Sequence, residues 1–347
     1  MNIGVIGCGR IADAHIMIYQ FIEDAKVTAV ADINLENAKK IAAKYKVEKV
    51  FKDYRDILET KDLDFVDICT PPSTHAKIAC EAAKCGHNIL LEKPMALSTE
   101  ECREIIHTVE KEDVSLCVCH NQLFFPAMMK AKSLVNSGYY DIVSFRTSIR
   151  ENPEMFNVPK WNVTEKEKGL IWEVGCHPAY LHLHFLDDIK EVYAVGSKVK
   201  YPVFDEFTVI LRTSGKAFGI MEISWLSKET EKIYEINCSD GKRVFMIAPP
   251  PYADQGYDVL LEKTGIAESS FYSEVKKLFG YLMKRRSPFG YYIGHFNLLT
   301  SYIQSLKKDS EPPIKPEDAM NTIKLLECIE TSLRTRKIVK LNLSSQS

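Results

Sequence analysis

The sequence has no hydrophobic run that approaches the ~18 residues of a transmembrane helix. It also lacks an excess of one charge, because 45 Lys and Arg face 47 Asp and Glu, which leaves a formal net charge of −2. So small an imbalance gives no reason to expect nucleic acid or a membrane surface as a partner. Because the first predicted strand begins at Asn2, we also expect no signal peptide. These absences predict a cytoplasmic protein.

The ten cysteines include no C-x-x-C pair of the kind that binds zinc or performs redox chemistry. They are scattered through apolar segments, where a free cysteine behaves as a small buried hydrophobic residue. Cys117 and Cys119 have suitable chemistry for a metal but lack partners at ligand spacing. We therefore expect reduced, structural thiols and no metal site.

The first third of the chain alternates between apolar strands and amphipathic helices. Its 347 residues suggest about two domains at ~150 residues each. Alternation of this kind is typical of β-α-β units, whose right-handed crossovers give a parallel sheet with both faces covered. The predicted strands are 2–6, 27–31, 65–69, 88–91 and 115–119, and the predicted helices are 10–21, 35–45, 74–84 and 99–112. Residues 1–121 are therefore predicted to form a Rossmann-type doubly wound α/β domain.

After residue 121, the predicted strands and helices no longer alternate. Helices are predicted at 127–137 and 170–186, and a strand at 142–149. Strands then follow one another at 191–198, 204–213, 217–225, 232–238 and 242–247, separated by turn signals such as Asp240-Gly241. Three helical segments follow at 269–283, 291–307 and 316–335. Residues 122–347 are thus predicted to form an α+β domain on a mainly antiparallel, open-faced sheet, whose last helix and tail can pack back on the first domain.

A glycine-rich turn joins the first strand to the first helix. Gly7 permits a tight turn, Gly9 lets the backbone approach a pyrophosphate, and Ala12 keeps the helix close to the sheet. The loop that we expect to contact the cofactor comprises Gly7, Cys8, Gly9, Arg10, Ile11 and Ala12. Asp32 ends the second strand, where a carboxylate accepts hydrogen bonds from a ribose diol and repels a 2′-phosphate. The pattern predicts a dinucleotide site in which NAD is favoured over NADP.

Further segments carry a resemblance to one family. Thr70-Pro71-Pro72-Ser73-Thr74-His75 follows the strand at 65–69, Glu92-Lys93-Pro94 follows the strand at 88–91, and His120-Asn121 follows the strand at 115–119. Together with the glycine loop and the helix that carries Glu173 and His177, they resemble the Gfo/Idh/MocA oxidoreductases over nearly the whole chain. The resemblance implies that Thr70, Pro71, His75, Glu92, Lys93 and Asn121 also line the cofactor site.

Three residues are expected to perform the chemistry. Lys93 lies just past the carboxyl end of a parallel strand, where a cation stabilises negative charge that develops on a substrate oxygen. Glu173 and His177 are four residues apart in a predicted helix and share a face. The resemblance implies that His177 is the general acid/base and that Glu173 orients it.

The sequence departs from the family pattern near this histidine. Glu173 replaces the commoner Asp, and Tyr180 stands where a second Asp is expected. A tyrosine can hydrogen-bond a sugar hydroxyl but is not an anion at neutral pH. Further candidates for substrate contact are Gln122, Arg150 and Trp161. His182 and His184 are not expected to bind one metal ion, because they differ by about 200° around a helix.

The resulting prediction is an NAD(P)-dependent dehydrogenase or reductase that transfers a hydride between nicotinamide and a secondary alcohol or ketone of a sugar, a cyclitol or a sugar derivative. Two alternatives remain open at this point. A redox-neutral lyase or glycosidase would use NAD only transiently, and a dinucleotide-binding sensor would perform no chemistry. A half-exposed second sheet would need covering, so we expect a homodimer or homotetramer that associates through it.

Overall fold

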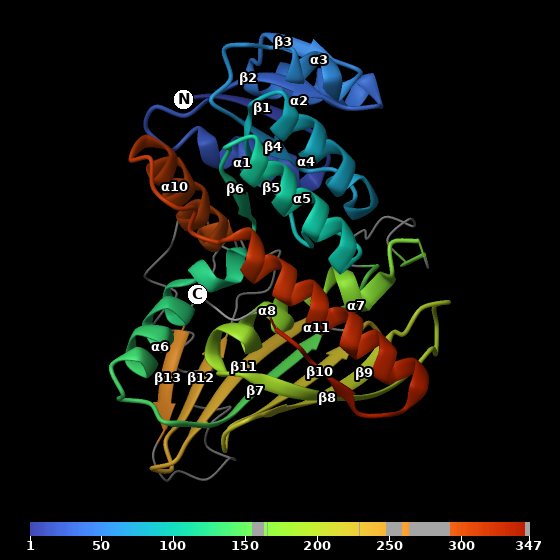
Figure 1. Ribbon diagram of the computed structural model, residues 1–347, viewed down its shortest axis with the longest axis vertical. Helices are drawn as coiled ribbons and strands as arrows, with labels where there is room; N and C mark the ends of the chain where they lie inside the picture. The colour runs from blue at the N-terminus through green and yellow to red at the C-terminus, as the bar shows by residue number, and fades with distance from the viewer. Residues whose placement is uncertain (155–162, 165, 229, 248–258, 264–291, 344–347) are drawn as a thin grey trace. The chain divides into compact units, whose positions relative to one another are not determined.

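The computed structural model describes residues 1–154, 163–164, 166–228, 230–247, 259–263 and 292–343 (Figure 1). The chain divides into two compact units. The first comprises Met1–Asn121 and His295–Ile323, and the second comprises Gln122–Gly294 and Lys324–Ser347. Assigning every residue after 121 to the second domain was therefore wrong for residues 295–323. The predicted helix at 269–283 lies outside the described residues.

The described strands of the first unit form a six-stranded parallel sheet in the order β3-β2-β1-β4-β5-β6. The strands are β1 (Asn2–Ile6), β2 (Lys26–Ala31), β3 (Lys49–Phe51), β4 (Phe65–Ile68), β5 (Asn88–Leu91) and β6 (Leu116–Val118). Strands β1 and β4 at the centre are almost entirely buried, as expected where helices cover both faces of a parallel sheet. This order confirms the doubly wound Rossmann-type fold.

The predicted helices of this unit begin within a residue or two of their expected positions, and a short helix, α3, is added to them. They are α1 (Arg10–Tyr19), α2 (Leu35–Tyr45), α3 (Tyr54–Leu58), α4 (His75–Lys84), α5 (Thr99–Lys111) and α10 (Ile293–Lys307), with short 3₁₀ helices η1 (Pro72–Thr74) and η2 (Asn121–Phe124). Asn34, Asp53 and Ser98 cap α2, α3 and α5 by accepting a backbone N–H bond. The sequence analysis missed β3 and α3, because elements of three and five residues show too little periodicity.

Helix α10 belongs to the first unit because its apolar face completes that unit's core. Tyr302 is fully buried, and its hydroxyl donates a 3.1 Å hydrogen bond to the Ser115 carbonyl. Its ring meets Phe65 edge-on, with centroids 5.6 Å apart. A segment almost two hundred residues away in sequence therefore packs beside β4 and β6, which periodicity alone does not reveal.

The second unit is built on an eight-stranded mixed sheet in the order β13-β12-β11-β7-β10-β9-β8-β14. The described strands are β7 (Ile142–Arg150), β8 (Ile189–Ser197), β9 (Glu206–Thr213), β10 (Phe218–Ser224), β11 (Glu231–Cys238), β12 (Arg243–Ile247), β13 (Val259–Lys263) and β14 (Val339–Lys340). The described helices are α6 (Pro126–Asn136), α7 (Gly169–Glu173), α8 (Cys176–Phe185) and α11 (Pro316–Thr335), the last of which runs from the first unit into the second.

The predicted succession of antiparallel strands is broken at the centre of this sheet. Strand β7 lies between β10 and β11, parallel to β10 and antiparallel to β11. The segment that contains α7 and α8 separates β7 from the later strands, so β7 can run in the same direction as β10. Near the end of the chain, β14 pairs with β8 and so lies in the second unit.

One face of this mixed sheet is covered by helix α8, and the other carries exposed side chains. On one face, the Phe145 ring packs against His182 and Phe185 of α8, with centroids 4.6 and 5.0 Å apart. The side chains that alternate with buried ones along β8, β9 and β10 include the exposed apolar residues Tyr193, Val195, Ile210 and Phe218. The sheet is open-faced, as predicted.

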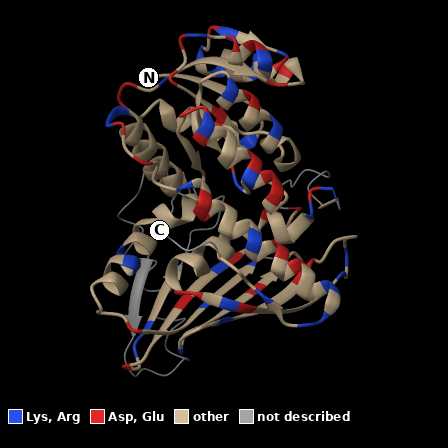
Figure 2. Cartoon of the chain, in the orientation of Figure 1, with Lys and Arg blue, Asp and Glu red and all other residues tan. Residues whose placement is uncertain are grey.

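Charge is evenly distributed within each unit. Figure 2 shows basic and acidic residues interspersed along the helices and strands. Among the described residues, no helix is both long and apolar enough to cross a membrane.

Candidate active site and dinucleotide site

The glycine loop has the geometry that its sequence predicts. Gly7 has a φ of +90°, and a Cβ at this position would lie 2.7 Å from the carbonyl oxygen of Cys69, so only glycine fits. A Cβ at Gly9 would meet none of the described atoms within 4 Å. Gly9 is also the N-cap of α1, where no side chain of the described residues caps the helix. The positive end of the α1 dipole therefore borders open space that suits a pyrophosphate.

Asp32 follows the carboxyl end of β2 and is held by two backbone groups. The Cys8 N–H donates to Oδ2 over 2.8 Å, and the Asn34 N–H donates to Oδ1 over 2.7 Å. Each oxygen keeps a lone pair for a ribose hydroxyl. The next residue, Ile33, is 87% exposed. These residues fit NAD.

The two loops that follow β4 and β5 are tied together by His75. This side chain is fully buried, and its ring nitrogens lie 2.8 Å from the carbonyl oxygens of Thr70 and Pro94. The Thr74 hydroxyl donates a further 2.8 Å bond to the Thr70 hydroxyl. His75 thus positions the Thr70-Pro71 loop and the Glu92-Lys93-Pro94 turn relative to one another, and any effect it has on the dinucleotide would act through these loops.

Glu92 lies in a buried polar cluster directly behind Lys93. Its Oε2 accepts the backbone N–H of Lys93 over 3.1 Å, and its Oε1 lies 3.3 Å from His15 Nε2. The other ring nitrogen of His15 is 2.9 Å from Asp67 Oδ2, which also accepts the Tyr19 hydroxyl. Burial opposes the charge on His15, but Asp67 and Glu92 raise its pKa to about 10. Burial would likewise raise the pKa of Glu92, but His15 lowers it to about 2.

Sequence reasoning assigned Glu92 to the cofactor site and did not foresee this cluster. Asn121, the first residue of η2, borders this cluster, with its side-chain nitrogen 3.3 Å from Nδ1 of His295. Both residues are buried. The cluster fixes the backbone on either side of Lys93, the residue expected to contact the substrate oxygen.

In the second unit, Glu173 and His177 lie on two short helices instead of one. Helix α7 ends at Glu173, and α8 starts at Cys176. Val174 and Gly175 between them keep right-handed helical dihedral angles. A Cβ at Gly175 would lie 2.4 Å from the Ile171 carbonyl oxygen, so a glycine is needed at this break. The single helix predicted at 170–186 was therefore wrong at its centre.

His177 is anchored by a chain of buried polar groups. Its Nδ1 lies 2.8 Å from the Tyr180 hydroxyl, which accepts the Gln122 backbone N–H over 3.2 Å. The Gln122 side chain in turn accepts the Tyr234 hydroxyl over 2.9 Å. Tyr180 is only 2% exposed, so it contacts His177 in the interior and does not present a large surface to a ligand. Tyr234 was missed, because nothing in the sequence joins β11 to Gln122.

The remaining candidates are placed as follows. Arg150 is exposed at the end of β7, and Trp161 lies outside the described residues. The ring nitrogens of His182 lie 2.8 Å from the Pro178 carbonyl oxygen and 3.2 Å from that of Phe145. His182 is therefore a packing residue of α8.

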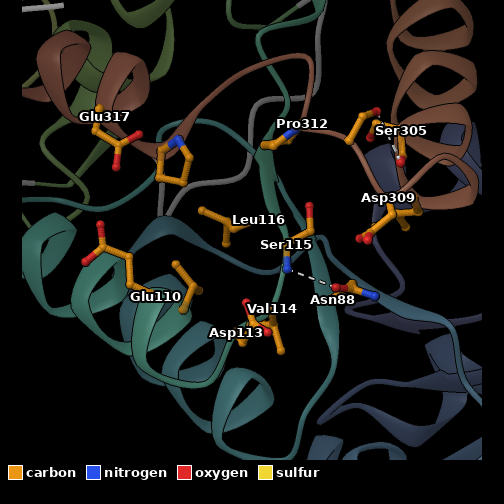
Figure 3. Close-up of a pocket in the computed structure, with 14 residues that line it drawn as sticks. Asn88, Glu110, Asp113, Val114, Ser115, Leu116, Ser305, Asp309, Pro312 and Glu317 are labelled. Carbon is orange, nitrogen blue, oxygen red and sulfur yellow. Dashed lines mark hydrogen bonds between the residues drawn. The ribbon is translucent and has the colours of Figure 1, made fainter. Parts of the chain in front are cut away.

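A hollow of about 380 Å³ in the first unit is separate from these residues. It lies at the amino ends of β5 and β6, where the Ser115 N–H donates a 2.9 Å bond to the Asn88 side chain (Figure 3). Glu92 and the dinucleotide loops follow the carboxyl ends of the parallel strands, at the opposite edge of the sheet. The hollow therefore does not belong to the dinucleotide site.

Comparisons with known proteins match both halves of the chain. Residues 1–120 match the family described as "Oxidoreductase family, NAD-binding Rossmann fold", and residues 128–244 match the "GFO/IDH/MocA C-terminal domain". A levoglucosan dehydrogenase of Pseudarthrobacter phenanthrenivorans is 34% identical over 71% of this chain and 73% of its own. The chain belongs to the Gfo/Idh/MocA family. This family membership confirms the predicted resemblance and shows an oxidoreductase whose first unit binds NAD.

More distant relatives extend the similarity over the whole length. A myo-inositol 2-dehydrogenase of Thermotoga maritima is 24% identical over 98% of each chain. Among solved structures, a levoglucosan dehydrogenase in complex with NADH superposes with a TM-score of 0.79, at 20% identity, over 99% of this chain and 100% of its own. At that identity the superposition shows the shared fold.

Proposed function

We propose that this oxidoreductase interconverts a secondary alcohol and a ketone on a sugar or cyclitol, with His177, Glu173 and Lys93 as its catalytic residues. The part-buried hydrogen bond between His177 Nδ1 and the Tyr180 hydroxyl carries this assignment, because it fixes a histidine ring in the manner that acid/base catalysis requires. Relatives that act on levoglucosan and myo-inositol support the substrate class.

Each of these residues has a separate role in cofactor binding or catalysis. Gly7, Gly9 and the N-terminus of α1 hold the pyrophosphate, and Asp32 holds the adenosine ribose. When bound, NAD⁺ supplies the acceptor for the hydride that leaves the substrate carbon. His177 takes the hydroxyl proton as the C–O bond becomes a carbonyl, and the Lys93 ammonium stabilises the negative charge on that oxygen. In the reverse direction, His177 returns the proton.

The first experiment is a panel of sugars, cyclitols and sugar acids with NAD⁺, followed by NADH absorbance. We expect net NADH with at least one of them, and we expect Lys93→Ala to abolish it while the exposed control Lys84→Ala does not. Consumption of a substrate without net NADH would instead support a redox-neutral lyase. NADH binding without any turnover across the panel would support a sensor and contradict the proposal.

A second copy of this chain is the partner that we propose for the open sheet face. Tyr193, Val195, Ile210 and Phe218 form an exposed apolar patch on adjacent strands, and such patches commonly mark protein interfaces. Light scattering should therefore show a dimer or tetramer that Ile210→Glu dissociates. Phe21→Glu, which places the same charge at an exposed phenylalanine of the first unit, should leave it intact. A monomeric wild-type chain would contradict this proposal.

The thiols support a reducing compartment. All ten cysteines lie in the described residues, and all are free. Most of them are buried, where an unpaired thiol packs as a hydrophobic group. A cytoplasmic location agrees with this pattern.

A further inference from the structure

Four side chains with metal-binding chemistry converge in the core of the first unit, behind the Glu92-Lys93 turn. His15 comes from α1, Glu92 from the end of β5, Cys119 from the end of β6 and His295 from the start of α10. All four are buried, and one potential ligand atom from each lies within 4.8 Å of the others. We infer that these four residues form a structural zinc site.

The donor set matches the chemistry of zinc. Two imidazole nitrogens, one thiolate and one carboxylate oxygen are ligands that Zn²⁺ accepts in tetrahedral sites. Four protein ligands leave no open position, which is characteristic of a structural and not a catalytic ion. The sequence analysis predicted no metal, because the four residues are separated by 27 to 176 positions and Cys119 has no metal-binding partner near it in sequence except Cys117.

The separations within the cluster are close to those of a loaded site. His15 Nε2 lies 3.3 Å from Glu92 Oε1 and 4.0 Å from Cys119 Sγ. Tetrahedral zinc with bonds of 2.0 to 2.3 Å places its ligand atoms roughly 3.3–3.8 Å apart. The widest pairs therefore need to close by about 1 Å, which side-chain rotation provides.

The surroundings of His15 are those of a metal ligand. Its Nδ1 faces Asp67 Oδ2 at 2.9 Å, so the ring keeps an N–H donor to Asp67 and presents the Nε2 lone pair to an ion once the ion has displaced the Nε2 proton. Asp67 is itself fixed, because it accepts the Tyr19 hydroxyl over 2.9 Å and the Cys69 thiol over 3.3 Å. A carboxylate that orients a histidine in this way accompanies most zinc-bound histidines.

Glu92 provides a second, independent indication. The residue is only 5% exposed, and its Oε1 makes no hydrogen bond of normal geometry with the described residues. This oxygen lies 3.3 Å from His15 Nε2, which is an ion-pair distance, but it is poorly aligned for a hydrogen bond. An ion bound here would replace this contact with a direct bond to the buried carboxylate oxygen. On binding, Zn²⁺ replaces the thiol proton of Cys119 and any proton on His15 Nε2, and both protons leave to solvent.

The test must load the metal while the chain folds, because the site is closed. The full chain, without a metal-binding tag, is expressed in medium supplemented with zinc, and zinc per chain is measured by elemental analysis. Parallel growth with Co²⁺ supplies a spectroscopic probe, since a thiolate bound to Co²⁺ gives a sulfur-to-metal charge-transfer band. We expect close to one ion per chain and this band in the near ultraviolet.

Substitutions of the proposed ligands test which residues bind the metal. Cys119→Ser should abolish the charge-transfer band, and both Cys119→Ser and His295→Gln should lower the metal content at least tenfold. Cys117→Ser, a buried thiol two residues away that is not in the cluster, should leave both unchanged. Circular dichroism verifies folding, and His295→Gln serves if Cys119→Ser does not fold. Wild-type protein without zinc or cobalt, or metal that persists in both ligand variants, would overturn the site.

Discussion

Replacing Tyr180 with phenylalanine tests whether the anchored histidine is the catalytic base. The change removes the hydroxyl that lies 2.8 Å from His177 Nδ1 and that accepts the Gln122 backbone N–H. Gln122 is fully buried, so its N–H would be left without this acceptor. An unsatisfied buried donor costs about 1–3 kcal/mol of unfolding free energy.

The catalytic effect should exceed the effect on folding. Without the hydroxyl, the His177 ring can rotate, and misplacing a catalytic group by about 1 Å lowers the rate by up to about 100-fold. We therefore expect Tyr180→Phe to lower kcat/KM about 10- to 100-fold with NADH affinity unchanged. Tyr302→Phe is the matched control, because it also removes a buried hydrogen-bonded hydroxyl but lies in the first unit. It should lower stability by about 1 kcal/mol and leave kcat/KM intact.

A second variant at position 180 distinguishes the orientation of the His177 ring from the effect of a nearby charge on its pKa. Tyr180→Asp places a carboxylate on the same helical face, three residues after His177. A nearby anion favours the imidazolium, so the acidic limb of the kcat/KM profile should move up by about 1–3 pH units. Steady-state rates in the oxidation direction from pH 5 to 9 give this profile. If Tyr180→Phe stays within twofold of wild type and Tyr180→Asp leaves the profile unchanged, His177 is not the base.

Other perturbations have equally defined outcomes. Lys93→Ala should lower kcat by about 10²- to 10³-fold while NADH fluorescence titrations change less than twofold, and an active variant would remove Lys93 from the mechanism. Gly9→Ala should weaken NADH binding at least tenfold without changing the melting temperature, since its Cβ would meet only open space among the described atoms. Gly7→Ala, at a φ of +90°, should instead lower the unfolding free energy by about 1–3 kcal/mol, and equal melting temperatures for the two variants would contradict the loop geometry. Burial, together with the nearby charge of Lys132, lowers the pKa of His184 from 6.5 to about 4. The contribution of His184 to the free energy of unfolding is therefore full above pH 6.5 and decreases as the pH falls from 6.5 to about 4. His184→Gln should therefore reduce the slope of unfolding free energy against pH in this window by up to about 1.4 kcal/mol per pH unit, and an unchanged slope would show that His184 is not neutral in the fold.

Local patterns predicted the first unit well. The glycine loop, Asp32 and the Glu92-Lys93-Pro94 turn each follow directly from a strand, so their positions depend only on residues near them in sequence. The alternation of strands and helices then determines the parallel sheet through the handedness of its crossovers. For these residues, the local sequence is therefore sufficient to predict their place in the fold.

Long-range pairing was not predictable in the same way. Nothing near β7 indicates that it lies between β10 and β11, because strand order depends on contacts between distant segments. The same holds for the polar cluster around His15, whose members come from four separate elements. The role of Tyr180 could not be predicted either, because its hydroxyl accepts a hydrogen bond from the backbone N–H of Gln122, a residue 58 positions away.

The central claim is that a hydride passes between a sugar-like carbon and bound NAD. The most direct measurement incubates the protein with NAD⁺ and the perdeuterated forms of the sugars and cyclitols in the panel, then determines the isotope content of the nicotinamide by mass spectrometry. The account predicts NADH that carries one deuterium from the substrate, formed at least about 100-fold more slowly by the Lys93→Ala protein. NADH without deuterium, or product formed while the cofactor remains NAD⁺, would contradict it.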